Sequence, residues 1–180
     1  MKYLLAFFLL FASPAIAAEY TIDKENSAIT FSGEHAGNEF NGAFEEWDAS
    51  IIFDAQDLES SNITATFNTA SAKTGDKLYD GTLPQGSWFD VKNYPHATFE
   101  TTSITVNEDG SYKANATLTI RDIMRPLSFD FTLEEGETTH AKAAFAIDRL
   151  DYDIGKGADD DGTWVSLAIG ITLNIVASKQ

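Results

Sequence analysis

The sequence contains no cysteine at any of its 180 positions. This absence excludes disulfide bonds, an anchor on a lipid-modified cysteine and covalent attachment of a c-type haem. Basic residues are also few, with 12 Lys and Arg against 28 Asp and Glu and a formal net charge of -16. So acidic a surface repels nucleic acid and anionic lipid head groups. We therefore expect no nucleic-acid partner.

Beyond its first residues the chain also lacks any apolar run of about 18 residues, the length that spans a membrane. At the start, Lys2 precedes a short apolar run from Leu4 to Ala12, and an Ala-x-Ala cleavage site ends at Ala17. This pattern predicts a signal peptide over residues 1–17, cleaved near Ala17, with an N-terminal membrane anchor as the alternative. We expect one exported domain over residues 18–180, located in the bacterial periplasm.

Hydrophobic residues are plentiful, at 43% of the chain, and most of them alternate with polar ones. Ile29 and Phe31, for example, share one face of a segment whose other face carries Thr30 and Ser32. Roughly eight or nine such segments, mostly joined by short turns, predict an all-β protein. A two-sheet sandwich and a closed up-and-down barrel both fit, and long consecutive hairpins favour an antiparallel barrel of about eight strands.

Interruptions of the alternation predict the bends, turns and helices. A change of parity at Glu45-Glu46 indicates a bend, and residues 74–83 predict a short helix in the connector before residue 97. Asn107 to Gly110 is typical of a hairpin turn, and Arg121 to Pro126 predicts another turn. The alternation from Val165 to Ile175 predicts the last strand.

The segment from Gly86 to Phe99 is the densest in aromatic residues and fits neither a helix nor a regular strand. We interpret it as a connector that returns the chain to the barrel wall at Phe99. Trp88, Phe89 and Tyr94 are therefore candidates for a gate at one end of a pore. Simple packing of these three side chains as an end cap is the alternative.

The chain carries a set of motifs at Tyr20 to Asp23, Ser27 to Phe31, His35 with Gly42 and Phe44, Trp88 to Phe99, Leu118 to Arg121, Arg125-Pro126 and Tyr152 to Gly155. Taken together, these motifs resemble the YceI-like family of exported, lipocalin-like polyisoprenoid-binding proteins. Asp122 and Met124 stand where the family usually has Gly and a small hydroxyl residue. The resemblance covers essentially the whole mature chain and implies an antiparallel barrel whose apolar pore takes up a long isoprenoid chain, such as a quinone tail or a polyprenyl phosphate.

The inward faces of the predicted strands supply the candidate ligand-binding residues. A packed interior without a ligand is the alternative for the same apolar set. His35, near a strand end, is a candidate contact for a polar head group, although a buried, hydrogen-bonded structural histidine is the favoured interpretation. The predicted pore-lining residues are Ile29, Phe31, His35, Phe40, Phe44, Ile51, Phe67, Phe99, Leu118, Phe129, Phe131, Phe145, Leu167, Ile169 and Ile171.

No metal site, cofactor or enzymatic activity is predicted. The three histidines, His35, His96 and His140, are scattered without metal-ligand spacing. The run from Asp159 to Asp161 lacks the alternate spacing of a calcium loop, so it predicts a solvated loop. Acidic residues lie mostly in turns or on outward faces, and no serine stands in a nucleophile-elbow context.

Four cations, Lys92, Arg121, Arg125 and Arg149, are the candidates for contact with a phosphate head group. With so many carboxylates nearby, surface ion pairs are the simpler expectation for them, which favours a neutral, quinone-like head group.

The sequence thus predicts a periplasmic protein that binds or carries a long-chain isoprenoid lipid without chemistry of its own. One alternative is an accessory to a membrane b-type cytochrome, because residues 83–88 and 149–155 resemble the branch of the family found near such cytochromes. Another is a stress-response structural protein that binds no lipid. The oligomeric state, the head group and the chain length stay open.

Overall fold

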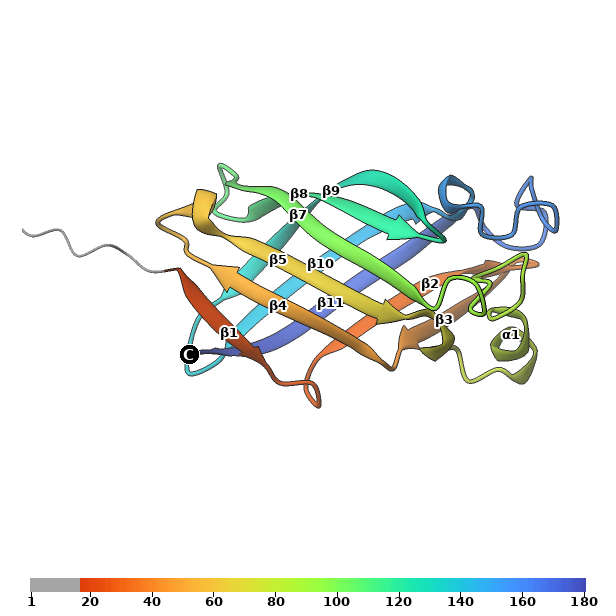
Figure 1. The fold of residues 1–180 in the computed structure, drawn as a ribbon, viewed down its shortest axis with the longest axis horizontal. Helices are drawn as coiled ribbons and strands as arrows, with labels where there is room; N and C mark the ends of the chain where they lie inside the picture. Colours follow the sequence, from red (N-terminus) through yellow and green to blue (C-terminus); the bar gives the residue numbers. More distant parts are fainter. Residues whose placement is uncertain (1–16) are drawn as a thin grey trace, which may run out of the picture.

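The computed structural model describes residues 17–180, so residues 1–16 of the predicted signal peptide lie outside the described part. Eleven strands dominate, with one α-helix and three short 3-10 helices (Figure 1). The strands are β1 (Ala18–Ile22), β2 (Ala28–His35), β3 (Asn38–Phe44), β4 (Trp47–Phe53), β5 (Asn62–Asn68), β6 (Ala72–Lys73), β7 (His96–Val106), β8 (Tyr112–Ile120), β9 (Ile123–Glu134), β10 (Thr139–Asp148) and β11 (Ala168–Lys179). The helices are η1 (Leu58–Ser60), η2 (Thr69–Ser71), α1 (Lys77–Thr82) and η3 (Arg149–Tyr152).

Eight of the strands close into a ring, which confirms the predicted barrel. The order is β1, β4, β5, β7, β8, β9, β10 and β11, and β11 then pairs with β1. All the pairings are antiparallel, as consecutive hairpins require. The edge of β11 that pairs with β1 also pairs with β2, through Gly170–Asn174. From there, β2, β3 and β6 extend the wall of the barrel.

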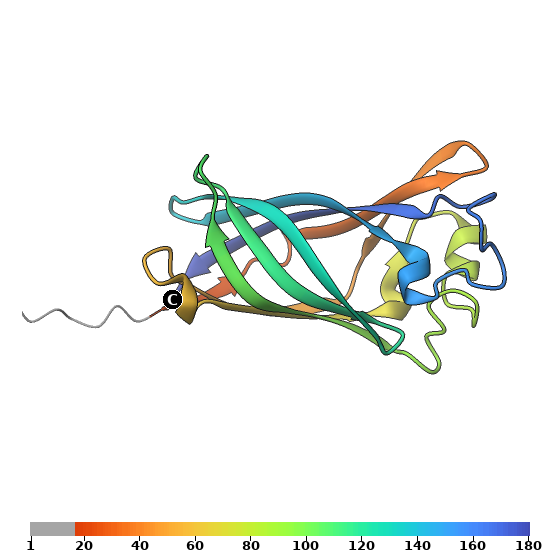
Figure 2. The same ribbon diagram turned by 90° about the horizontal axis from the view of Figure 1, so that it is seen from above.

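The two ends of the barrel differ in what covers them. One end, here the helical end, carries α1, η3 and the long connectors on either side of them (Figures 1 and 2). The opposite end, here the hairpin end, carries the C-terminus and the short turns of residues 54–61, 107–111 and 135–138. No helix within residues 17–180 is both long and apolar enough to cross a membrane.

The bend and the short helix fall where the sequence predicts them. Strand β3 ends at Phe44 and β4 begins at Trp47, so the chain turns at Glu45-Glu46. The helix α1 lies within the predicted residues 74–83. Asp76 caps its start, since the side chain accepts hydrogen bonds from the backbone N–H groups of Leu78 and Tyr79 at 2.7 and 3.3 Å.

The predicted turn from Arg121 to Pro126 is wrong in its extent. Only Arg121 and Asp122 form the turn, both with positive φ, and Pro126 lies inside β9 opposite Thr117 of β8. A proline is tolerated there because the other edge of β9 has no strand partner at that point, so no ladder bond needs its missing N–H. Two consecutive positive φ angles are the backbone of a two-residue hairpin turn.

The predicted last strand begins three residues too early. Strand β11 starts at Ala168, and of the preceding residues only Val165 makes an isolated bridge, to His35. Leu167 therefore precedes the strand, next to Gly162. The segment still bonds to the end of β2, where the Ser166 N–H donates to the Glu34 carbonyl at 2.9 Å and the Ala36 N–H to the Trp164 carbonyl at 2.8 Å. A period-two pattern cannot distinguish such an irregular extended segment from a regular strand.

Candidate functional site: an apolar cavity along the barrel

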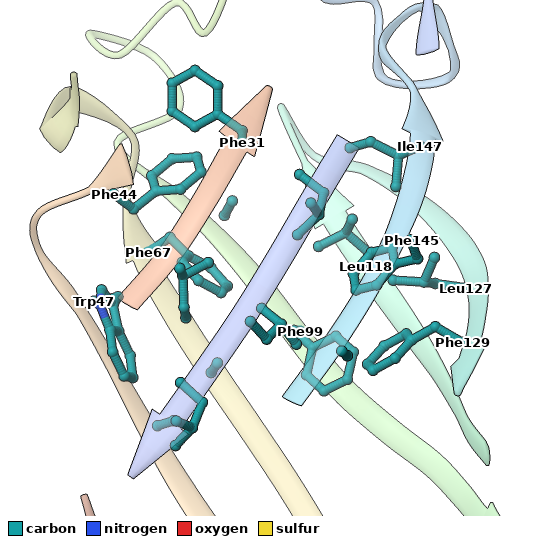
Figure 3. Close-up of a pocket in the computed structure, with 18 of the residues that line it drawn as sticks. Phe31, Phe44, Trp47, Phe67, Phe99, Leu118, Leu127, Phe129, Phe145 and Ile147 are labelled. Atoms are coloured by element: carbon teal, nitrogen blue, oxygen red, sulfur yellow. The ribbon is translucent and has the colours of Figure 1, made fainter. Parts of the chain in front are cut away.

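A cavity of about 250 Å³ runs along the interior of the barrel (Figure 3). It is bordered on β11 by every inward residue from Ile169 to Ala177. Eight residue steps of a strand correspond to about 27 Å, so this volume is spread over a long and narrow channel. The shape suits an extended chain better than a compact ligand.

Most of the predicted pore-lining residues lie on the wall of this cavity, together with Trp88 and Phe89 from the predicted gate. Figure 3 shows several of them pointing inward from opposite strands. On the wall are Ile29, Phe31, Phe40, Phe44, Ile51, Phe67, Phe99, Leu118, Phe129, Phe131, Phe145, Ile169 and Ile171.

Three predicted site residues lie away from the wall. His35 Nδ1 is 3.0 Å from the hydroxyl of Tyr79 in α1, which makes it a hydrogen-bonded structural histidine at the helical end. The ring of Tyr94 faces the guanidinium of Arg121 at 5.7 Å, outside the channel. Leu167 packs near Gly162 before β11 begins.

Sequence reasoning left several wall residues out of the predicted site. Alternation did point Trp47, Ile63, Leu127, Leu173 and Ile175 inward, so the signal was present for these five. The predicted site also omitted the two ends of the channel, where Leu83, Arg149 and Ile154 close one side and Tyr20, Ile22 and Thr139 line the other.

Aromatic rings shape the channel and leave it open between them. Toward the helical end, the ring centroid of Phe44 lies 5.6 Å from Phe31, 5.5 Å from Phe67 and 6.0 Å from Phe89. These tilted and edge-on contacts are the favoured geometries of aromatic pairs. Phe44 is thus the centre of an aromatic cluster that narrows the cavity without filling it.

The connector around Trp88 is fixed from behind by main-chain hydrogen bonds. Arg121 Nη1 donates to the carbonyl of Trp88 at 2.9 Å and Nη2 to that of Gly86 at 3.1 Å. The N–H of Gly155 donates to the Ser87 carbonyl at 2.6 Å. Three separated loops therefore meet at this segment, as an end cap requires.

Beneath the cap lies a buried ion pair between Arg149 and Asp159. Arg149 Nη2 is 2.8 Å from Asp159 Oδ2, and the two side chains are only 2% and 3% exposed. Further hydrogen bonds run from the guanidinium to the carbonyl oxygens of Ile154, Val165 and Ser166 at 2.8, 2.9 and 3.2 Å. The charged guanidinium of Arg149 can be buried this completely because each of its nitrogen atoms donates at least one hydrogen bond.

This pair corrects two predictions. Asp159 is not in a solvated loop, although its neighbours Asp160 and Asp161 are exposed. Arg149 does not form a surface ion pair, and its donors already bond to protein oxygen atoms, so they do not offer a phosphate a ready site. Of the remaining candidate cations, Arg121 and Arg125 donate to main-chain carbonyls and Lys92 is exposed.

Polar groups on the cavity wall are few, and they are engaged or neutral. The Thr101 hydroxyl accepts from the backbone N–H of Ile63 at 2.9 Å. Burial, reinforced by the nearby carboxylate of Glu135, raises the pKa of Tyr20, so its hydroxyl stays protonated at neutral pH. The two cations among the lining residues, Lys142 and Arg149, are paired with Glu134 and Asp159, so the interior offers a ligand mainly apolar contact.

Within residues 17–180, no three His, Cys, Asp or Glu side chains gather closely enough to hold a metal ion. The wall of the cavity also carries no acid–base pair with a nucleophile beside it. Its geometry can enclose an apolar molecule, and the wall residues give no basis for assigning a reaction.

Comparison with known sequences identifies the domain. A model of the YceI-like domain family matches residues 20–177. A UPF0312 protein of Pseudomonas putida is 30% identical over 183 residues, which cover 96% of this chain and 92% of that relative. A UPF0312 protein of Pseudomonas syringae pv. syringae is 33% identical over 122 residues, and there the match spans 66% of this chain but only 64% of the relative.

Solved structures share the fold. The crystal structure of Burkholderia cenocepacia BcnA superposes with a TM-score of 0.83 at 26% sequence identity, covering 88% of this chain and all of that one. A polyisoprenoid binding domain from Saccharophagus degradans, described as implicated in plant cell wall breakdown, gives a TM-score of 0.71 over 92% of this chain and 100% of that one. At 13% identity, this second likeness is one of fold alone.

Proposed function

Because the chain belongs to the YceI-like family, we propose that its barrel binds a long-chain apolar isoprenoid lipid in the central cavity. The observation that carries the proposal is the shape and chemistry of that cavity, a channel that follows about 27 Å of the tilted strand β11 and has a mainly apolar wall. The fold shared with a polyisoprenoid binding domain supports the same ligand class. The role is that of a binding protein, without a reaction of its own.

Apolar contact supplies the affinity in this proposal. Each methylene removed from water contributes roughly 0.8 kcal/mol, so a chain of several isoprene units binds well through buried area alone. A cavity of 250 Å³ exceeds the 150 Å³ or so that admits a benzene molecule, and a longer chain makes room by rotating wall side chains such as Phe44. The ligand is thus selected mainly by its length and flexibility.

We assign a neutral, quinone-like head group to the ligand. A diphosphate needs free cationic donors, whereas Arg149 donates its hydrogen bonds to protein oxygen atoms and Arg121 holds the connector. Carriage of such a lipid across the periplasm, after cleavage of the signal peptide near Ala17, completes the proposal. Partnership with a membrane b-type cytochrome is the alternative, and co-purification tests it.

The direct experiment extracts the purified protein with organic solvent and identifies lipids by mass spectrometry, then measures binding of added two-isoprene ubiquinone. We expect a bound isoprenoid or saturable uptake of the quinone. Reproducible absence of both would overturn the proposal and favour a structural protein without a lipid.

A pair of variants on β5 links the binding to the cavity. Ala65 lies on the cavity wall, and the adjacent Thr66 points to solvent. Ala65→Phe fills part of the channel, so we expect at least tenfold weaker quinone binding, whereas Thr66→Phe adds the same ring outside and leaves binding unchanged. Equal effects of the two variants would place the binding site elsewhere.

A further inference from the structure

Strands β9 and β10 are hydrogen-bonded over only part of their length. Phe131–Glu134 pairs with His140–Ala143, and the pairing stops there. Residues 123–130 of β9 then pair only with β8, and residues 144–148 of β10 pair only with β11. Figure 2 shows the two strands diverging toward the helical end. We call this unpaired stretch, residues 123–130 and 144–148, the seam.

The backbone of β9 is built for an edge without a partner. In the β8–β9 ladder that follows the two-residue turn, Pro126 and Thr117 form a non-hydrogen-bonded pair. The backbone nitrogen of Pro126 therefore points away from β8 and toward the seam. Proline offers no N–H there. The other residues whose N–H groups face this edge, Met124, Ser128 and Asp130, are exposed and can bond to water.

Side chains close the seam where the backbone does not. The rings of Phe129 on β9 and Phe145 on β10 stack across it, with centroids 4.3 Å apart and an interplanar angle of 15°. Leu127 and Ile147 line the cavity from the same two strands (Figure 3). Ring contacts of this kind separate by rotation about side-chain bonds, without breaking a backbone hydrogen bond.

Two other routes into the channel are held by polar contacts. At the helical end, a ligand would have to displace the cap over the buried Arg149–Asp159 pair. On the opposite wall, residues 47–50 of β4 also lack a partner on one edge, but Lys24 spans it, contacting the Trp47 ring and carbonyl and the Asp48 carboxylate. The hairpin end, where Tyr20, Ile22 and Thr139 line the channel and the edge-on rings of Phe53 and Phe131 stand on its wall, is the competing route.

We propose that the seam between β9 and β10 is the lateral portal through which the isoprenoid chain reaches the cavity. The hydrogen-bonded segment at Phe131–Glu134 holds the strands together at one end of the portal, and Arg125 Nε, which donates to the Asp151 carbonyl at 3.1 Å, spans the other end. Phe129 and Phe145 act as the gate. The inference rests on the proposed function and adds the path of the ligand.

Cross-linking tests the portal, and a chain without cysteine makes the chemistry specific. Continuing the β9–β10 register beyond Phe131 and Ala143 places Ser128 opposite Ala146, and both are exposed on the outer face. The double variant Ser128→Cys with Ala146→Cys is bridged with a cleavable thiol cross-linker. The control, Ser103→Cys with Asn115→Cys, receives the same bridge across the paired strands β7 and β8.

The readout is the rate at which two-isoprene ubiquinone quenches tryptophan fluorescence after rapid mixing, with Trp47 and Trp88 on the cavity wall as reporters. We expect the seam cross-link to slow uptake at least tenfold, cleavage of the linker to restore it, and the control to match the parent. Thermal unfolding of each variant verifies that the barrel is intact.

Uptake within twofold of the parent in the cross-linked seam variant would overturn the portal while leaving the proposed function in place. Failure of the parent itself to take up the quinone would overturn the proposed function and the portal with it. Equal slowing by both cross-links would also count against the portal, because it would show that stiffening any part of the wall is sufficient.

Discussion

At the scale of single residues, the Arg149–Asp159 pair shows how a charge can lie under the end of an apolar channel. Asp159 accepts from Arg149 and from the backbone N–H groups of Trp164 and Val165 at 3.1 and 2.8 Å. Gly155 permits this arrangement because its φ is +84° and a Cβ there would lie 2.3 Å from Arg149 Nη1. The pair therefore orders the loop that carries Ile154 to the cavity.

Replacing Asp159 with asparagine should destabilise the protein by about 3 kcal/mol, since it leaves a buried guanidinium without its counter-charge and turns one acceptor into a donor. Urea unfolding measures the change. Asp160→Asn, at the exposed neighbouring position, is the control and should change the free energy of unfolding by less than about 0.5 kcal/mol. A similarly small change for Asp159→Asn would mean that the ion pair does not stabilise the loop.

At the scale of elements, the connector from Gly86 to Phe99 is better described as a cap than as a gate. Its aromatic density indicates an ordered segment, and Trp88 and Phe89 do reach the cavity wall. However, its carbonyl groups are held by Arg121, and the Trp88 ring lies over the buried Arg149 at 5.7 Å. A gate must move, whereas these contacts tie the connector to the β8–β9 turn and to the loop that follows β10.

Trp88→Ala tests this distinction. We expect a loss of about 3 kcal/mol in the free energy of unfolding, the cost of removing a large packed side chain, with quinone uptake no faster than in the parent. Urea unfolding and rapid-mixing fluorescence measure the two quantities. Trp164→Ala, at a side chain that is 59% exposed, serves as the control. An unchanged stability combined with lost or accelerated uptake would instead identify Trp88 as a gate.

At the scale of the whole molecule, the barrel combines a closed ring of strands with an interior that is incompletely filled. One buried cluster includes Phe31 and Phe89 and another includes Phe129 and Phe131, and the channel passes along both. A molecule that fills this space binds the folded state only, because the channel exists only when the ring is closed. Ligand binding and global stability are therefore coupled.

Two-isoprene ubiquinone at a hundredfold excess over its Kd should stabilise the lipid-free protein by about 2.7 kcal/mol. For a chain of this size that corresponds to a rise in Tm of roughly 5–10 °C, measurable by calorimetry. Ala65→Phe should show a much smaller rise at the same quinone concentration, because its cavity is partly occupied. Identical shifts in the two proteins would indicate binding at the outer surface.

Much of the fold and of the candidate wall follows from the sequence alone. Alternation is a local property, since successive side chains of a strand point to opposite faces. It correctly predicted that Phe31, Phe44, Phe129 and Ile171 point inward. The exported location and the signal peptide stay predictions, because they depend on residues 1–17 and on processing. The absence of cysteine likewise excludes any disulfide from the sequence alone.

Only the tertiary structure decided which parts of the wall pair and which separate. Alternation does not tell whether β9 meets β10 along its whole length, because that distance is set by the closure of all eight strands. The same holds for Arg149, whose partner Asp159 is chosen by how a loop folds under the cap. Periodicity therefore determined the faces of the barrel, and closure determined its ion pair, its cavity and its seam.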